Sequence, residues 1–115
     1  ARFAAKHAGA YAASKHASRG LTRTLSAELV QRGVTANAIV PGFVDTEMVR
    51  EEADKVASLR GIEHEEAIKL FLRIQPLGRL IEPEEVGALT AFLCSENAGA
   101  ISGQAYGIDG GAYQA

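Results

Sequence analysis

The sequence has a single cysteine and no long hydrophobic run, and each shortage excludes a class of protein. Its only cysteine, Cys94, leaves no internal disulfide framework, and the apolar helical stretch around it predicts a small buried hydrophobe. No run approaches the ~20 apolar residues that a membrane-spanning helix needs. The net charge is −2 and the pI about 5.9, so neither nucleic acid nor a membrane is expected as a partner.

Histidine is also scarce, and its positions do not predict a metal site. His7 and His16 have no metal-ligand spacing, and His64 begins a His-Glu-Glu run with Ile68 where a zinc-protease helix needs a second histidine. The run Ala-Arg-Phe-Ala-Ala-Lys at the start has no apolar signal-peptide core. We therefore expect a cytoplasmic protein without a metal.

An apolar content of 47% is ordinary for a globular domain, and its periodicity divides the chain into helices and strands. The order helix, strand, helices, strand predicts an α/β fold in which a helical crossover joins parallel strands of a doubly wound sheet. The expected helices span residues 9–32, 46–60, 64–74 and 83–97, and the expected strands 34–40 and 104–108. Two buried stripes are expected on the first and last helices, formed by Leu21, Leu25 and Leu29 and by Val86, Leu89, Thr90 and Leu93.

The most informative pair in the chain is Tyr11 and Lys15, at the two ends of the run Tyr-Ala-Ala-Ser-Lys. Residues at i and i+4 share one face of a helix. A tyrosine has a reference pKa of about 10, and a neighbouring cation favours the phenolate. The pair is therefore a hypothesis for an acid/base device, although the same spacing also occurs in surface pairs of amphipathic helices.

Further motifs follow that pair in a defined order. Residues 37–46 read Asn-Ala-Ile-Val-Pro-Gly-Phe-Val-Asp-Thr, and later come Ile-Ser-Gly-Gln at 101–104 and Ile-Asp-Gly-Gly at 108–111. In order and spacing, these motifs together with Tyr11 and Lys15 resemble the short-chain dehydrogenase/reductase family over nearly the whole chain. The resemblance implies the C-terminal part of a Rossmann-like, doubly wound parallel sheet.

The resemblance also implies an oxidoreductase that transfers a hydride between NAD or NADP and an alcohol or ketone. In that case Tyr11 is the general acid/base, Lys15 favours its phenolate and bonds the nicotinamide ribose, and Asn37 ties neighbouring segments by hydrogen bonds. The implied cofactor-binding residues are Tyr11, Lys15, Pro41, Gly42, Val44 and Thr46. A 3-hydroxy or 3-oxo acid or thioester is the favoured substrate, under a lid whose candidate pocket walls are Met48, Leu59, Leu70 and Phe71.

Two features of that family have no counterpart in residues 1–115. No Gly-rich dinucleotide loop is present, and the family's catalytic serine would precede residue 1. We therefore expect residues 1–115 to be the C-terminal half of a single NAD(P)-binding domain. The isolated chain should be inactive, and the full-length protein should be a homo-oligomer, either a dimer or a tetramer. A hypothesis of another class is a non-catalytic oligomerisation or scaffold piece of the same fold.

Overall fold

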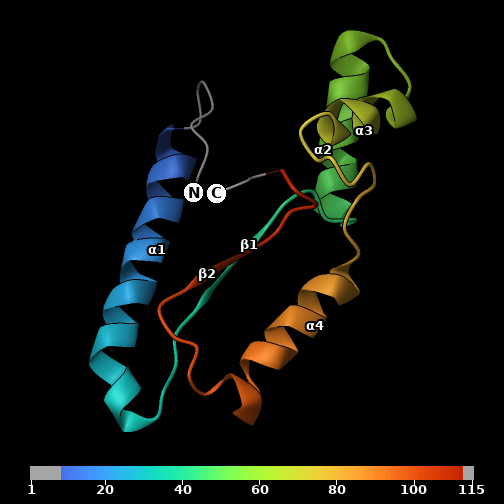
Figure 1. Cartoon of the computed structure of the whole chain (residues 1–115). Helices are drawn as coiled ribbons and strands as arrows, with labels where there is room; N and C mark the ends of the chain where they lie inside the picture. The colour runs from blue at the N-terminus through green and yellow to red at the C-terminus, as the bar shows by residue number, and fades with distance from the viewer. Residues whose placement is uncertain (1–8, 113–115) are drawn as a thin grey trace. The chain divides into compact units, whose positions relative to one another are not determined.

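The computed structural model describes residues 9–112, in which one long helix precedes the first of two short strands and further helices separate the strands (Figure 1). The expectations for His7 and for the segment before residue 9 lie outside the described residues. In chain order, the elements are α1 (Gly9–Leu29), the 3-10 helix η1 (Val30–Arg32), β1 (Ala38–Pro41), α2 (Glu47–Arg60), α3 (His64–Leu72), α4 (Pro83–Leu93), the 3-10 helix η2 (Glu96–Ala98) and β2 (Ala105–Ile108).

The two strands are hydrogen-bonded neighbours and run parallel (Figure 1). The Ala38 N–H donates to the Gln104 carbonyl at 2.8 Å, and further along both strands the Gly42 N–H donates to the Ile108 carbonyl at 3.0 Å. The pairing advances in the same direction on both chains, as parallel strands require. The predicted α/β class and the parallel arrangement are therefore confirmed.

The strand predicted from residue 34 begins only at Ala38, because side chains and not a regular ladder hold the segment before it. Asn37 Nδ2 donates to the Ile101 carbonyl at 2.9 Å, and the Gln104 N–H donates to Asn37 Oδ1 at 3.2 Å. One amide thus satisfies backbone groups on two sides of a turn. The prediction that Asn37 ties neighbouring segments together is confirmed.

The first helix has the predicted extent, but it buries a different face. Gly33 caps its 3-10 extension in the left-handed region at φ 77°, which glycine adopts without strain. Leu21 is 59% exposed and Leu25 37%, so the prediction of a buried leucine stripe is wrong for both. The buried residue of α1 is Ser26, whose hydroxyl shares a 2.6 Å hydrogen bond with the Ser102 hydroxyl.

The α2–α3 pair provides the best-defined core (Figure 1). Ala53 of α2 packs with Ala67 and Ile68 of α3, and small side chains at these positions let the two helices approach closely. Ile74, the last residue of the helix predicted over residues 64–74, lies beyond the end of α3 and is 59% exposed. The neighbouring apolar side chains that complete the core are Val56, Ala57, Ile62, Phe71, Leu72 and Leu80.

Pro83 begins α4 as predicted, with Glu84 and Glu85 in the first turn. The predicted buried stripe is not observed, because no residue of α4 is buried and Thr90 is exposed. Cys94 is exposed as well, so the prediction of a buried thiol is wrong. Within residues 9–112, no helix is long and apolar enough to cross a bilayer.

The described residues fall into two compact units. The first unit comprises the chain up to Val40 together with Leu89–Gly107, and the second comprises Pro41–Ala88 with the residues from Ile108 onward. Helix α1 therefore belongs to the first unit. The loop after β1 and the α2–α3 pair belong to the second.

Candidate functional site

The predicted acid/base pair lies near the start of α1. Lys15 Nζ is 5.4 Å from the centroid of the Tyr11 ring, within the range of a cation–π contact. Tyr11 is 66% exposed and Lys15 is exposed too. The Ser14 hydroxyl between them donates to the Tyr11 carbonyl at 2.7 Å and so bonds to its own helix. The structure thus brings the phenol and the ammonium together on an accessible helix face.

Pro41 and Gly42 lie where β1 ends, and the backbone of Gly42 is tightly enclosed. A Cβ atom at position 42 would lie 2.9 Å from Asp109 Cα and would overlap Gln75 Oε1. The Gly42 N–H also donates to the Ile108 carbonyl at 3.0 Å, which ties the backbone in place. Glycine is needed here because neighbouring atoms approach where a side chain would begin.

Val44 forms a parallel bridge with Ile81 immediately after that glycine. The Ile81 N–H donates to the Phe43 carbonyl at 2.9 Å, and the Asp45 N–H donates to the Ile81 carbonyl at 2.7 Å. In such a bridge the N–H and C=O of the central residue point to the opposite side. The main chain of Val44 is therefore directed away from Ile81, with its carbonyl 3.4 Å from the Thr46 hydroxyl that donates to it.

Thr46 is the N-cap of α2, at the start of the helix predicted over residues 46–60. Its Oγ1 accepts a hydrogen bond from the Val49 N–H at 3.3 Å, and its backbone is extended, with φ −130° and ψ 160°. This hydroxyl satisfies one of the N–H groups that every helix leaves unpaired at its start. The Thr46 hydroxyl therefore bonds to the backbone of α2 through Val49 and also lies beside the main chain of Val44.

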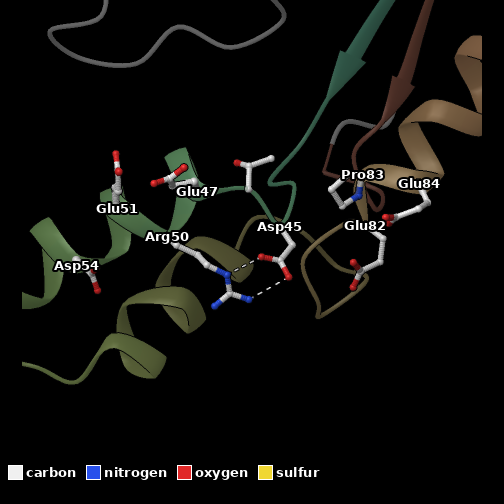
Figure 2. Close-up of a pocket in the computed structure, with 9 residues that line it drawn as sticks. Asp45, Glu47, Arg50, Glu51, Asp54, Glu82, Pro83 and Glu84 are labelled. Carbon is white, nitrogen blue, oxygen red and sulfur yellow. Dashed lines mark hydrogen bonds and ion pairs between the residues drawn. The ribbon is translucent and has the colours of Figure 1, made fainter.

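An open pocket of about 580 Å³ adjoins this helix start (Figure 2). Arg50 and Asp45 point toward each other in it and form a bidentate ion pair, with Nε–Oδ1 at 2.7 Å and Nη2–Oδ2 at 3.0 Å. The hydrogen bond from Arg50 holds the pKa of the Asp45 carboxyl below its usual value. The residues that line the pocket are Asp45, Thr46, Glu47, Arg50, Glu51, Asp54, Glu82, Pro83 and Glu84.

Negative charge dominates this pocket. Its lining has six carboxylates and one guanidinium, and that guanidinium is already paired with Asp45. Like charges repel an incoming anion, so the pocket disfavours a phosphate or a carboxylate. A neutral amide or a hydroxyl is the better match for this part of the second unit.

The predicted site residues thus form two groups. Tyr11 and Lys15 lie together on α1 in the first unit. The other group lies in the second unit and is one continuous stretch that contains Pro41, Gly42, Val44 and Thr46.

Two of the predicted pocket walls, Met48 and Leu59, are 76% and 87% exposed on α2 and do not line the pocket of Figure 2. Phe71 instead stacks on Phe43, with ring centroids 5.1 Å apart. Among the described residues, no group of three or more His, Cys, Asp or Glu side chains is placed to hold a metal ion.

Sequence reasoning missed Gln75, which is completely buried and bonds to the backbone of the loop after β1. No periodicity marks it, because it lies in an irregular segment between α3 and the turn that begins at Pro76. The only available signal was a polar residue directly before a proline turn, which is common on protein surfaces.

Comparison with known proteins agrees with the resemblance read from the sequence. A family model described as enoyl-(acyl carrier protein) reductase matches residues 1–113. D-beta-hydroxybutyrate dehydrogenase of Cupriavidus necator is 44% identical over 103 residues, which are 89% of this chain and 40% of that protein. The chain thus spans about two fifths of the length of such curated relatives.

Solved structures show the same backbone. A short chain dehydrogenase family protein of Francisella tularensis superimposes with a TM-score of 0.92 at 33% identity, over 96% of this chain and 46% of that one. A variant of actinorhodin polyketide ketoreductase, solved with NADPH, gives a TM-score of 0.87 at 34% identity, over 96% of this chain and 42% of that one. The fold is therefore the C-terminal part of a Rossmann-like, doubly wound parallel sheet, and the chain belongs to the short-chain dehydrogenase/reductase family.

Proposed function

We propose that residues 1–115 form the C-terminal half of a single NAD(P)-binding domain in an oxidoreductase that interconverts an alcohol and a ketone. The observation that carries this proposal is the Tyr11–Lys15 pair, held one helical turn apart on an exposed face with Lys15 Nζ 5.4 Å from the phenol ring. An exposed phenol beside a cation can exchange a proton with a substrate, whereas a buried pair could not reach one.

In the proposed mechanism, Tyr11 is the catalytic acid and base. Its hydroxyl gives a proton to the carbonyl oxygen during ketone reduction and takes one from the alcohol during oxidation. Lys15 stabilises the phenolate by its charge and bonds the nicotinamide ribose. The bound NAD or NADP supplies the hydride chemistry.

We assign the nicotinamide side of the cofactor to the stretch of the second unit that contains Pro41, Gly42, Val44 and Thr46. The main chain of Val44 points away from Ile81, so its N–H and C=O suit the edge of a carboxamide. The surplus of carboxylates beside Thr46 favours that neutral amide over a phosphate.

The proposed substrate is a 3-hydroxy or 3-oxo acid or its thioester. The name of the Cupriavidus relative, a D-beta-hydroxybutyrate dehydrogenase, supports this class, as does a polyketide ketoreductase among the solved structures. A homo-oligomeric state, as a dimer or tetramer, and a cytoplasmic location remain predictions.

The experiment is Tyr11→Phe in the full-length protein, assayed with 3-hydroxybutyrate and with acetoacetyl thioester and either cofactor. General acid/base groups contribute about 10²–10⁴-fold, so kcat should fall by that factor while cofactor affinity changes little. The matched control is Tyr106→Phe, which removes a tyrosine hydroxyl from a partly buried position of β2. Its activity should stay near that of the wild type. A Tyr11→Phe variant within about threefold of wild type would show that another group moves the proton.

A second proposal, a non-catalytic oligomerisation or scaffold piece, is supported by the exposed Leu21 and Leu25 on α1. These side chains offer apolar surface to another chain. The same assay distinguishes the two proposed functions. A wild-type full-length protein that assembles but neither binds NAD(P)H nor turns over a substrate would favour the scaffold.

A further inference from the structure

Gln75 is a buried polar side chain whose amide oxygen and nitrogen are both hydrogen-bonded. It lies just after α3 and is 0% exposed. Its Oε1 accepts from the Phe43 N–H at 2.8 Å, and its Nε2 donates to the Phe43 carbonyl at 3.2 Å and to the Arg79 carbonyl at 2.8 Å. Both hydrogens of the amide and one oxygen lone pair are therefore used, as a buried amide requires.

Two of the three hydrogen bonds of Gln75 join it to one residue of the loop after β1. Phe43 has both its N–H and its carbonyl bonded to the same amide. Its carbonyl also accepts from the Ile81 N–H at 2.9 Å. Because the Phe43–Val44 peptide group contains that carbonyl, these bonds fix its plane. They therefore also fix the direction of the Val44 N–H.

Backbone atoms approach the side chain of Gln75 closely. A Cβ atom on Gly42 would overlap Oε1, and one on Gly110 would lie 2.9 Å from Gln75 Cγ. Two glycines are thus packed against opposite parts of this side chain. The Phe43 ring also stacks on Phe71, with ring centroids 5.1 Å apart. The end of α3 therefore holds Phe43 through both its backbone and its side chain.

We propose that Gln75 is a positioning residue for the nicotinamide end of the cofactor, acting through the backbone of Phe43 on the main chain of Val44. This inference rests on the proposed function, because it assigns the nicotinamide carboxamide to Val44. In this proposal, Gln75 itself touches neither substrate nor cofactor. It sets the geometry of the loop that contacts the cofactor.

The competing explanation is that Gln75 only stabilises the fold. If Gln75 only stabilises the fold, its loss should lower the stability and weaken the binding of every ligand alike. If Gln75 is a positioning residue, its loss should weaken the binding only of the ligand that contacts the positioned loop. ADP-ribose separates the two, because it lacks the nicotinamide ring but keeps the adenosine, the pyrophosphate and the second ribose.

The test uses Gln75→Met in the full-length protein, since methionine keeps the length of the side chain and removes all three hydrogen bonds. The dissociation constants of NADH or NADPH, whichever binds more tightly, and of the matching ADP-ribose are measured by calorimetry. We expect the dinucleotide to bind about tenfold more weakly, ADP-ribose to bind unchanged, and kcat to fall about 10- to 100-fold through misplacement. Gln31→Met, at an exposed position of η1, is the matched control and should change none of these values.

Each outcome decides the question. Equal weakening of the dinucleotide and ADP-ribose, or no weakening of either, would overturn the positioning role. If Gln75→Met does not fold, Phe71→Leu loosens Phe43 through its side chain and leaves the Gln75 bonds intact, and the same two titrations decide. A wild-type protein that binds neither ligand would instead refute the proposed function itself, which is a different failure.

Discussion

Gly42→Ala tests directly how tightly the loop after β1 is enclosed. The new methyl group would overlap Gln75 Oε1 and lie 2.9 Å from Asp109 Cα and 3.1 Å from Asp109 Cβ. Asp109 Cα is a backbone atom, so it cannot swing away as the end of a long side chain would. Relief therefore requires a shift of the backbone at Asp109, and relief of the overlap with Oε1 also breaks the hydrogen bond from the Phe43 N–H to Gln75.

The expected loss of unfolding free energy is the sum of two costs, reduced by one gain. Overpacking a tight site costs about 1–3 kcal/mol, and a buried N–H left without its partner costs about 1–3 kcal/mol. The smaller entropy of alanine in the unfolded chain offsets about 0.4–1 kcal/mol. We expect Gly42→Ala to lose about 2–4 kcal/mol of unfolding free energy, which lowers the Tm of a 150–250-residue protein by roughly 4–16 °C.

The assay is thermal and urea unfolding of the full-length protein, with Gly87→Ala as the matched control. Nothing lies within 4 Å of a Cβ added at Gly87 in α4, so this change should stabilise the protein by up to about 1 kcal/mol. In a Gln75→Ala background, Gly42→Ala should cost about 0.5–3 kcal/mol less, because the obstructing amide is gone. A Gly42→Ala variant as stable as wild type, or strictly additive double-mutant costs, would refute the close approach.

Three further predictions concern the charge and the caps of the site. Lys15→Met should weaken the binding of NAD(P)H and of ADP-ribose alike by about tenfold, since both contain the ribose assigned to Lys15. Calorimetry that finds both affinities unchanged would rule out that contact. The pKa of Asp45 is lowered in the folded protein by the hydrogen bond from Arg50, so the pair stabilises the fold above the usual carboxyl pKa of about 4, and this contribution is lost as the pH falls through the lowered value. The Tm difference between wild type and Arg50→Met should therefore be largest near neutral pH and shrink in acid, and a difference that is constant with pH would contradict the pairing. Thr46→Ala should lose about 0.5–1 kcal/mol of unfolding free energy because the Val49 N–H loses its cap, whereas Thr46→Ser should lose little; denaturant unfolding that ranks the two variants equally would argue against the cap.

Local signals predicted most of the secondary structure. Thr46 at the start of α2, Pro83 at the start of α4 and Gly33 after η1 act through their own backbone dihedrals and hydrogen bonds. Such effects need only a few neighbouring residues, and so they can be read from sequence. The Tyr11–Lys15 contact is of the same kind, because the helical period alone brings i and i+4 together.

Burial was less predictable, because it depends on what packs against an element and not on its own pattern. Leu21 and Leu25 have the spacing of a buried stripe, yet in this chain they are exposed while Ser26 is buried. Cys94 likewise comes directly after an apolar helix, yet it is exposed. Periodicity identifies a face of a helix, and only the arrangement of the other elements decides whether that face is covered.

The sequence by itself therefore predicted the family and the element order, and it identified Tyr11, Lys15, Gly42 and Thr46 as candidate site residues. Only the tertiary structure revealed why Gly42 must be glycine and that Gln75 holds Phe43, because both depend on segments that lie more than thirty residues apart and meet across a turn and a strand end. A helical pair is set by bonds within one turn of backbone. The position of a buried amide depends on all the groups that pack against it and bond to it. No short stretch of sequence contains all of those groups.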